Sequence, residues 1–235
     1  QIHQNNMGFY RGPNIVTEDL ALALDFASSR CWTAGSTTAY DLTANNNNAT
    51  VNGSPATQDT GTPSQNMYFD GSNDYLQITA NETSLSFKPG QTIGMWVYYS
   101  NSVGRRNLWD QAYGGYGTWT HEGGGNINYY YGSNGGNGQS YKGFGSMNVP
   151  ENGWQYITST RYTGGAKWYL NGSLERTTTD SYTPMTNTTT NNIRIGLGYT
   201  GVYFQGNIAL VHAYTRGLSD SEVLQNYNAL KGRFI

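Results

Sequence analysis

Side chains that can do acid–base chemistry are few in this chain and poorly placed for it. The three histidines are His3, His121 and His212. Glu122 follows His121 directly, but neighbouring residues of a strand point to opposite faces, so the two make a poor acid–base pair. His212 stands in an apolar run, where we expect a satisfied structural residue. No nucleophile elbow, phosphate loop or HExxH motif occurs in the sequence.

Carboxylates are spaced too widely for hydrolysis of a glycosidic bond. That reaction needs two acidic side chains in one cleft, and alternate positions of a strand would place them on one face. The acids nearest to this arrangement in a strand context are Asp110 and Glu122, which lie well apart in the sequence. We therefore expect no enzymatic activity.

Oxygen ligands gather at one predicted hairpin, where Asp70, Asn73 and Asp74 could bind Ca²⁺. The alternative is an Asp-Gly turn in which Asp70 and Asn73 bond their own backbone, and we favour it. No other cofactor is indicated. Cys31 is the single cysteine, so the chain can form neither an intrachain disulfide nor a zinc finger.

The most suggestive surface chemistry lies between Tyr113 and Phe144, where tyrosine and tryptophan are mixed with glycine and asparagine. Exposed rings of this kind suit sugars or a protein partner. Tyr129, Tyr130 and Tyr131 are consecutive, so their rings cannot all point into one core. The alternative is that the rings of this segment only fill the core. The predicted contact residues are Tyr116, Trp119, Tyr130 and Tyr141.

The composition of the 235-residue chain is that of a β protein with a large polar surface. It has 31 Gly and 20 Tyr, and only 12% of its residues are charged. The formal net charge of -2 excludes a strongly basic nucleic-acid binder. No apolar stretch approaches the roughly 18 residues of a membrane span.

The elements that must position these residues are mostly short strands. Aromatic and β-branched runs, separated by Gly and Asn turns, recur at the roughly 8–12-residue spacing of β-sandwiches. One helix is predicted near the C-terminus, because Ser219 and Glu222 fit a capping box. Residues 1–19 are predicted to form an extended arm that packs on the body or on another chain. The domain itself is predicted to span residues 20–235.

Four segments of the chain carry a series of motifs in order. They are Tyr68-Phe-Asp-Gly-Ser-Asn-Asp-Tyr75, Ile93-Gly-Met-Trp-Val97, the pair Trp154–Ile157 and Trp168–Gly172, and the closing run Gly206–Glu222. Together they resemble the concanavalin-A-like jelly roll of the laminin-G-like group. The resemblance implies an all-β, antiparallel two-sheet jelly-roll sandwich with one short C-terminal helix. Members often close with an acidic run where this chain has Ile208-Ala-Leu-Val211, so the acids of that run are missing here.

The closing run is also similar to versions of this domain among the virion structural proteins of tailed bacteriophages. That likeness implies a non-enzymatic phage virion surface protein, either a capsid decoration or a fibre component that binds a receptor. Its partners would be capsid or tail proteins and a host surface glycan, and it would form a homo-oligomer on the virion surface. The alternatives are a secreted or cell-surface glycan-binding lectin, which would be extracellular, and then a polysaccharide-active enzyme of the same fold.

Overall fold

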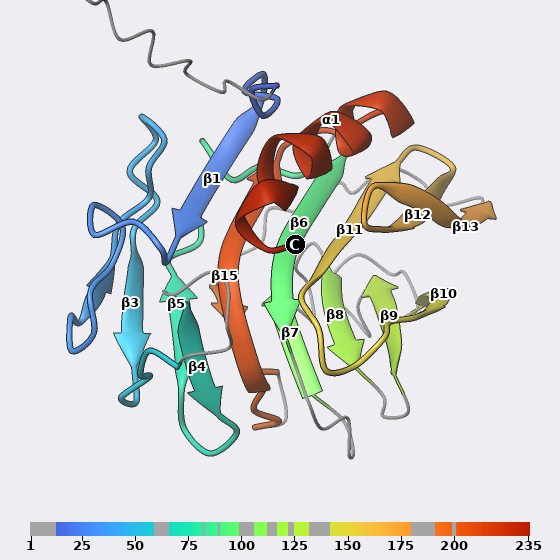
Figure 1. Cartoon of the computed structure of the whole chain (residues 1–235). Helices are drawn as coiled ribbons and strands as arrows, with labels where there is room; N and C mark the ends of the chain where they lie inside the picture. Colours follow the sequence, from blue (N-terminus) through green and yellow to red (C-terminus); the bar gives the residue numbers. More distant parts are fainter. Residues whose placement is uncertain are drawn as a thin grey trace, which may run out of the picture.

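The strands of this chain form two antiparallel sheets that face each other, with one helix outside them (Figure 1). The predicted all-β two-sheet sandwich with a short C-terminal helix is therefore confirmed. The computed structural model describes residues 13–58, 66–81, 83–88, 90–98, 106–111, 117–121, 125–131, 142–179, 191–198 and 201–235.

The first sheet has seven strands, in the order β1-β15-β6-β11-β12-β13, and β4 pairs with β15 beside this path. Its long central strands are rich in apolar and β-branched residues, which suit a pleated surface that is covered on both sides. The strands are β1 (Leu20–Asp25), β4 (Met67–Asp70), β6 (Gln91–Tyr98), β11 (Gln155–Tyr162), β12 (Gly165–Leu170), β13 (Ser173–Thr179) and β15 (Gln205–Tyr214).

The second sheet has eight strands, in the order β10-β9-β8-β7-β14-β5-β3-β2. They are β2 (Thr38–Ala39), β3 (Ala49–Asn52), β5 (Tyr75–Ile78), β7 (Arg106–Gln111), β8 (Gly117–His121), β9 (Asn126–Tyr131), β10 (Lys142–Asn148) and β14 (Ile193–Ile195). The helical elements that follow are α1 (Asp220–Leu230) and the 3-10 turn η1 (Lys231–Arg233).

The core between the sheets is built from large aromatic rings. Trp119 of the eight-stranded sheet and Trp168 of the seven-stranded sheet are both buried, with ring centroids 5.1 Å apart. The Trp119 indole Nε1 donates a hydrogen bond of 2.8 Å to Ser159 Oγ across the core. The prediction that Trp119 is a surface contact residue is therefore wrong. Its position in the strand register turns the ring inward, where it fills the sandwich.

Helix α1 and η1 cover the outer face of the seven-stranded sheet. The predicted capping box is present: Ser219 Oγ accepts from Glu222 N at 3.3 Å, and Ser219 N donates to Glu222 Oε2 at 2.8 Å. After η1, the ring of Phe234 stacks on Trp96 of β6 with centroids 4.0 Å apart. This cover explains why β6 is buried along nearly its whole length. Among the described residues, no helix is long and apolar enough to cross a membrane.

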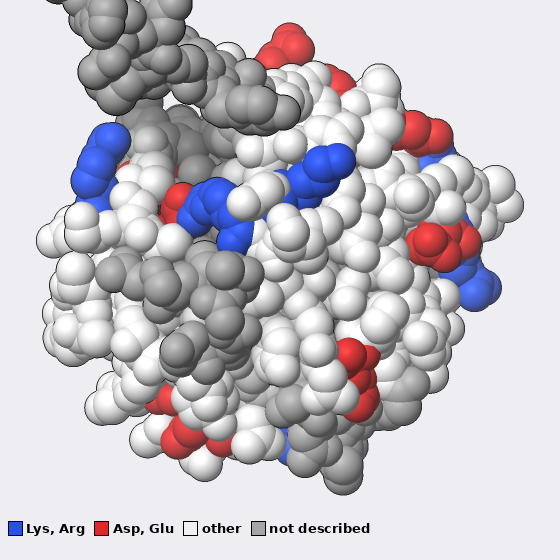
Figure 2. Space-filling view, in the orientation of Figure 1, with Lys and Arg blue, Asp and Glu red and all other residues white. Residues whose placement is uncertain are grey.

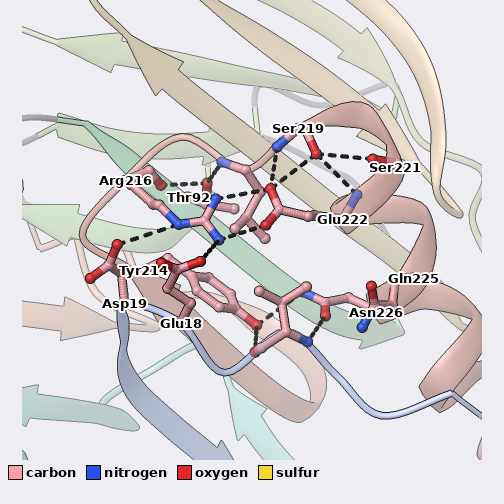
Figure 3. Close-up of polar contacts among 12 residues, drawn as sticks. Glu18, Asp19, Thr92, Tyr214, Arg216, Ser219, Ser221, Glu222, Gln225 and Asn226 are labelled. Atoms are coloured by element: carbon pink, nitrogen blue, oxygen red, sulfur yellow. Dashed lines mark hydrogen bonds and ion pairs between the residues drawn. The ribbon is translucent and has the colours of Figure 1, made fainter.

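The connection between β15 and α1 is held by Arg216 (Figure 3). Its guanidinium donates two hydrogen bonds, of 2.9 and 2.6 Å, to the two carboxylate oxygens of Glu222. This hydrogen-bonded pair lowers the pKa of Glu222 to about 2. Thr92 Oγ1 of β6 donates to Arg216 O and accepts from Leu218 N, both at 2.8 Å. These bonds fix the start of the helix on the sheet.

The segment before β1 is bonded to the helix and to β15. Val16 N donates to Asn226 Oδ1 at 2.7 Å, and Tyr214 Oη donates to Val16 O at 2.9 Å, in the region shown in Figure 3. Residues 13–19 therefore pack on the body, which is one of the two placements predicted for the arm. The rest of the arm, residues 1–12, lies outside the described residues.

Candidate functional site

The outer face of the eight-stranded sheet is the face of the sandwich that α1 does not cover. In the described part of the chain, the single α-helix packs on the other sheet and leaves this face without a helical cover. Paired residues of antiparallel strands lie on the same face, so the register defines a line of positions that crosses the sheet from β10 to β2. We call this line the transverse row. It consists of Gly143, Tyr130, Thr118, Asp110, Arg194, Gln77, Thr50 and Thr38.

The sequence neighbours of the row show which way it faces. Trp109, Tyr129, Leu76 and Ile195 each stand next to a row position, and all four are fully buried in the core. Side chains alternate between the two faces along a strand. The side chains of the four adjacent row positions, Asp110, Tyr130, Gln77 and Arg194, therefore point away from the core.

Four side chains of the row bring different chemistry together. Tyr130, Arg194 and Gln77 are half-buried, while Asp110 is buried and is paired in register with Arg194. A phenol ring, a guanidinium and an amide offer a flat apolar surface with hydrogen-bonding groups around it. Asp110 carries the only carboxylate of the eight row positions. The row therefore lacks the second acid that glycoside hydrolysis requires.

Two more tyrosines extend this face toward one end of the sheet. Tyr75 stands two positions before Gln77 in β5, so both side chains lie on the same face. The ring of Tyr75 contacts the ring of Tyr203, with centroids 6.3 Å apart and planes tilted by 53°. Both rings are half-buried, so each keeps part of its surface open to solvent.

The contact residues predicted from the sequence do not include Tyr75, Tyr203, Gln77 or Arg194. For three of them, the sequence pattern indicates a side chain that points outward from a strand. Gln77 and Arg194 each stand between two apolar residues, and Tyr75 precedes Leu76 in the same alternating strand. Such alternation predicts an outward side chain on a half-buried strand. Tyr203 has no such signal, because it lies outside the strands.

The predicted contact residues are not brought together as a set. Tyr130 lies on the transverse row and is half-buried, next to the fully buried Tyr129, so these consecutive rings do point in opposite directions. Trp119 belongs to the core, as shown above. Tyr116 and Tyr141 lie outside the described residues. Their role as contact residues stays a prediction.

The hairpin considered for calcium uses its carboxylates on the backbone. Asp74 Oδ1 accepts from Ser54 N at 2.8 Å, and Asp74 Oδ2 accepts from Asp70 N at 3.1 Å. Asp70 Oδ1 accepts from Ser72 N at 2.7 Å and from Asn73 N at 3.4 Å. These are the turn contacts expected of the structural alternative, with Asn73 contributing its backbone N–H rather than its side chain. No cluster of three or more candidate metal ligands occurs in the described part of the chain.

His212 is buried, as expected for a structural residue, but one of its ring nitrogens lacks the expected hydrogen bond. Its Nδ1 has no hydrogen-bond partner within the described residues. Burial lowers the pKa of His212 to about 4, and the nearby Asp25 carboxylate opposes this effect only in part. The imidazole is therefore neutral at neutral pH. The side chains of His121 and Glu122 lie outside the described residues.

Charged side chains are sparse on the side of the molecule that carries the helix. Figure 2 shows isolated blue and red groups on a mostly uncharged surface, with no extended patch of one sign among the described residues in view. This distribution agrees with the low charge content of the sequence. The described residues in this view form no continuous basic stripe of the kind typical of nucleic-acid binding.

Comparison with known proteins identifies the family of this architecture. A family model described as the concanavalin A-like lectin/glucanases superfamily matches residues 70–224, which confirms the resemblance drawn from the sequence motifs. None of the curated proteins matches the chain.

The solved structures with a similar fold include several binding domains. The binding domain of botulinum neurotoxin DC in complex with rat synaptotagmin II has a TM-score of 0.69 at 13% identity, over 91% of this chain and 52% of that one. The same domain in complex with SialylT has a TM-score of 0.69 at 14% identity, with the same coverage. The binding domain of Paraclostridial Mosquitocidal Protein 1 has a TM-score of 0.68 at 18% identity, over 90% of this chain and 52% of that one. The chain thus spans about half the length of these structures, and the likeness shows the fold.

Proposed function

Because this chain belongs to the concanavalin A-like lectin/glucanases superfamily, we propose that it is a non-enzymatic recognition domain that binds its partner through the outer face of the eight-stranded sheet. The observation that carries this proposal is the transverse row with the adjoining Tyr75–Tyr203 pair. Partly open rings beside hydrogen-bonding side chains are suited to recognition. A single carboxylate in register with a guanidinium is not suited to acid–base hydrolysis.

The similar solved structures support a binding role. They include a receptor-binding domain, a binding domain in complex with rat synaptotagmin II, and a binding domain in complex with a ligand named SialylT. We therefore expect either a protein or a glycan as the partner of this chain. Identity of 13–18% transfers no site residue to this chain.

We further propose that the domain acts on the surface of a phage virion, as a capsid decoration or a fibre component. The support is the similarity of its closing run to phage versions of the domain. Low charge and heavy use of Gly, Asn, Thr and Tyr suit a surface exposed outside cells. On a virion the partners would be capsid or tail proteins and a host surface glycan. Identical copies would meet around a symmetry axis, so a homo-oligomer is part of the proposal.

A secreted or cell-surface lectin is the second candidate, favoured by the half-buried Tyr75 and Tyr130 on the outer face of the eight-stranded sheet. Mass spectrometry of purified phage particles separates the two: the virion proposal expects the protein in particles, and its absence from them leaves the lectin.

Binding by the proposed face is tested with Tyr75→Ala on a glycan array and in a pull-down with virion proteins. Loss of a central aromatic contact typically costs about 2 kcal/mol or more, so we expect affinity to fall at least about tenfold. The matched control is Tyr162→Ala, which removes a partly exposed tyrosine of the other sheet and should bind like wild type. Equal affinity of Tyr75→Ala and wild type for the same partner would place the contact surface elsewhere.

A further inference from the structure

A groove on the helix-covered side of the sandwich has no part in the recognition face proposed above. It has a volume of about 540 Å³ and lies between β1, β15, the loop of residues 42–45 and the C-terminal segment. Its sheet residues belong to the seven-stranded sheet, whereas the transverse row belongs to the eight-stranded sheet. The groove is therefore a separate site.

The walls of the groove are mainly aliphatic. Among the described residues, no Trp, Tyr or Phe lines the groove, so a sugar ring would find no aromatic surface on which to stack. A polyhydroxylated ligand would also lose its hydrogen bonds to water, and the mainly aliphatic walls would replace few of them. An apolar ligand body fits this lining better. The aliphatic lining residues are Ile15, Leu20, Ala23, Leu42, Ala44, Leu210 and Leu230.

The two charged residues of the lining neutralise each other. Arg233 Nη1 and Nη2 donate to Asp25 Oδ2 and Oδ1 at 2.9 and 2.8 Å, which is a two-pronged ion pair. A charged ligand would have to compete with this pair for either partner. The lining therefore favours an uncharged ligand.

The walls are held in place before any ligand arrives. Asn45 Nδ2 donates to Leu20 O at 3.3 Å and to Ala21 O at 3.2 Å, which ties the loop to β1. Asp41 Oδ1, just before the loop, accepts from Ala23 N of β1 at 2.9 Å. This bond ties the start of the loop to β1. A preformed site loses less conformational freedom on binding than a flexible one.

Among the described residues that line the groove, His212 is the polar residue with a buried side-chain nitrogen that lacks a partner, whereas Asn45 and the Asp25–Arg233 pair are hydrogen-bonded. His212 pairs in register with Ala23, and both line the groove. The imidazole is only 3% exposed, and its Nδ1 lacks a hydrogen-bond partner in the described part of the chain. A neutral imidazole carries one donor and one acceptor nitrogen. A hydroxyl group, which can donate and accept, is its natural complement.

We propose that this groove binds a small uncharged molecule with an apolar body and one hydroxyl group that hydrogen-bonds to the His212 imidazole. The aliphatic walls take the body, and the Asp25–Arg233 pair excludes charged analogues. Neither step depends on the recognition face of the other sheet.

The test uses the full chain with p-cresol and 4-methylanisole, which share an apolar ring but differ in their hydroxyl donor. Binding is followed by NMR titration and calorimetry. We expect p-cresol to bind about fivefold to tenfold more tightly than 4-methylanisole, since one hydrogen bond separates them. His212→Phe should remove this difference. Ala44→Trp places a large side chain at an exposed lining position and should weaken both ligands.

The control is Tyr75→Ala, which changes the recognition face and should bind both probes like wild type. Failure of wild type to bind p-cresol, equal affinity for the two probes, or unchanged binding by Ala44→Trp would each overturn the proposal. None of these results bears on partner binding by the transverse row, which is measured separately.

Discussion

Acidification from pH 7 to pH 4 should destabilise this fold through His212. The imidazole is buried between β1, β15 and the C-terminal segment, where Asp25, Arg233 and the ring of Tyr214 are near it. Burial lowers its pKa from 6.5 to about 4, the Asp25 carboxylate opposes this shift, and the Arg233 guanidinium adds to it. His212 therefore binds a proton at a lower pH in the folded protein than in the unfolded chain.

The sign and size of the effect follow from the two pKa values. Below pH 6.5 the unfolded state binds a proton at His212, while the folded state binds it only near pH 4. Stability is therefore full above pH 6.5, falls as the pH drops toward 4, and levels off below that. At about 1.4 kcal/mol per pKa unit, the loss is on the order of 3 kcal/mol.

The assay is urea unfolding followed by tryptophan fluorescence at several pH values between 7 and 4. Wild type should lose stability with a slope of up to about 1.4 kcal/mol per pH unit. His212→Phe keeps a buried ring without a titrating group. The free energy of unfolding of this variant should therefore change far less between pH 7 and pH 4 than that of wild type, whatever its value at pH 7.

Glu222→Gln is the matched control. The pKa of Glu222 is lowered from 4.5 to about 2. The stability that its pairing with Arg216 contributes is therefore lost mainly below pH 4.5, whereas protonation of His212 acts between pH 6.5 and 4. The control should keep the slope between pH 6.5 and 4. A His212→Phe variant with the same slope as wild type would refute the assignment of this pH dependence to His212.

Three further predictions concern the fold. Trp119→Ala should destabilise the protein by about 3–5 kcal/mol, because it empties a core position and leaves Ser159 Oγ without its partner; a near-wild-type urea midpoint would contradict its place in the core. Ser219→Ala should cost about 1 kcal/mol by removing the helix cap, measured by the same unfolding assay, and a neutral result would show that the cap is dispensable. In Gly94→Ala the new Cβ would meet Tyr156 Oη at 2.6 Å, so thermal stability should drop and should be partly restored by adding Tyr156→Phe; no restoration would locate the strain elsewhere.

Local patterns in the sequence determined the elements and the class of fold. Short alternating runs and Gly and Asn turns predicted the two-sheet sandwich, and the capping box at Ser219 predicted where α1 begins. The consecutive tyrosines predicted that one ring leaves the core, and Tyr129 and Tyr130 do point in opposite directions. These signals work because strand alternation and helix capping depend on residues a few positions apart.

Only the tertiary structure decided which side chains meet. Alternation marks two faces of β8, but its pairing with β9 and its packing against Trp168 place Trp119 in the core. The transverse row joins Asp110, Arg194 and Gln77 from strands that are far apart in the sequence. The groove at His212 likewise needs β1, β15 and η1 together. Such contacts depend on register and on long-range packing, which no local pattern in the chain specifies.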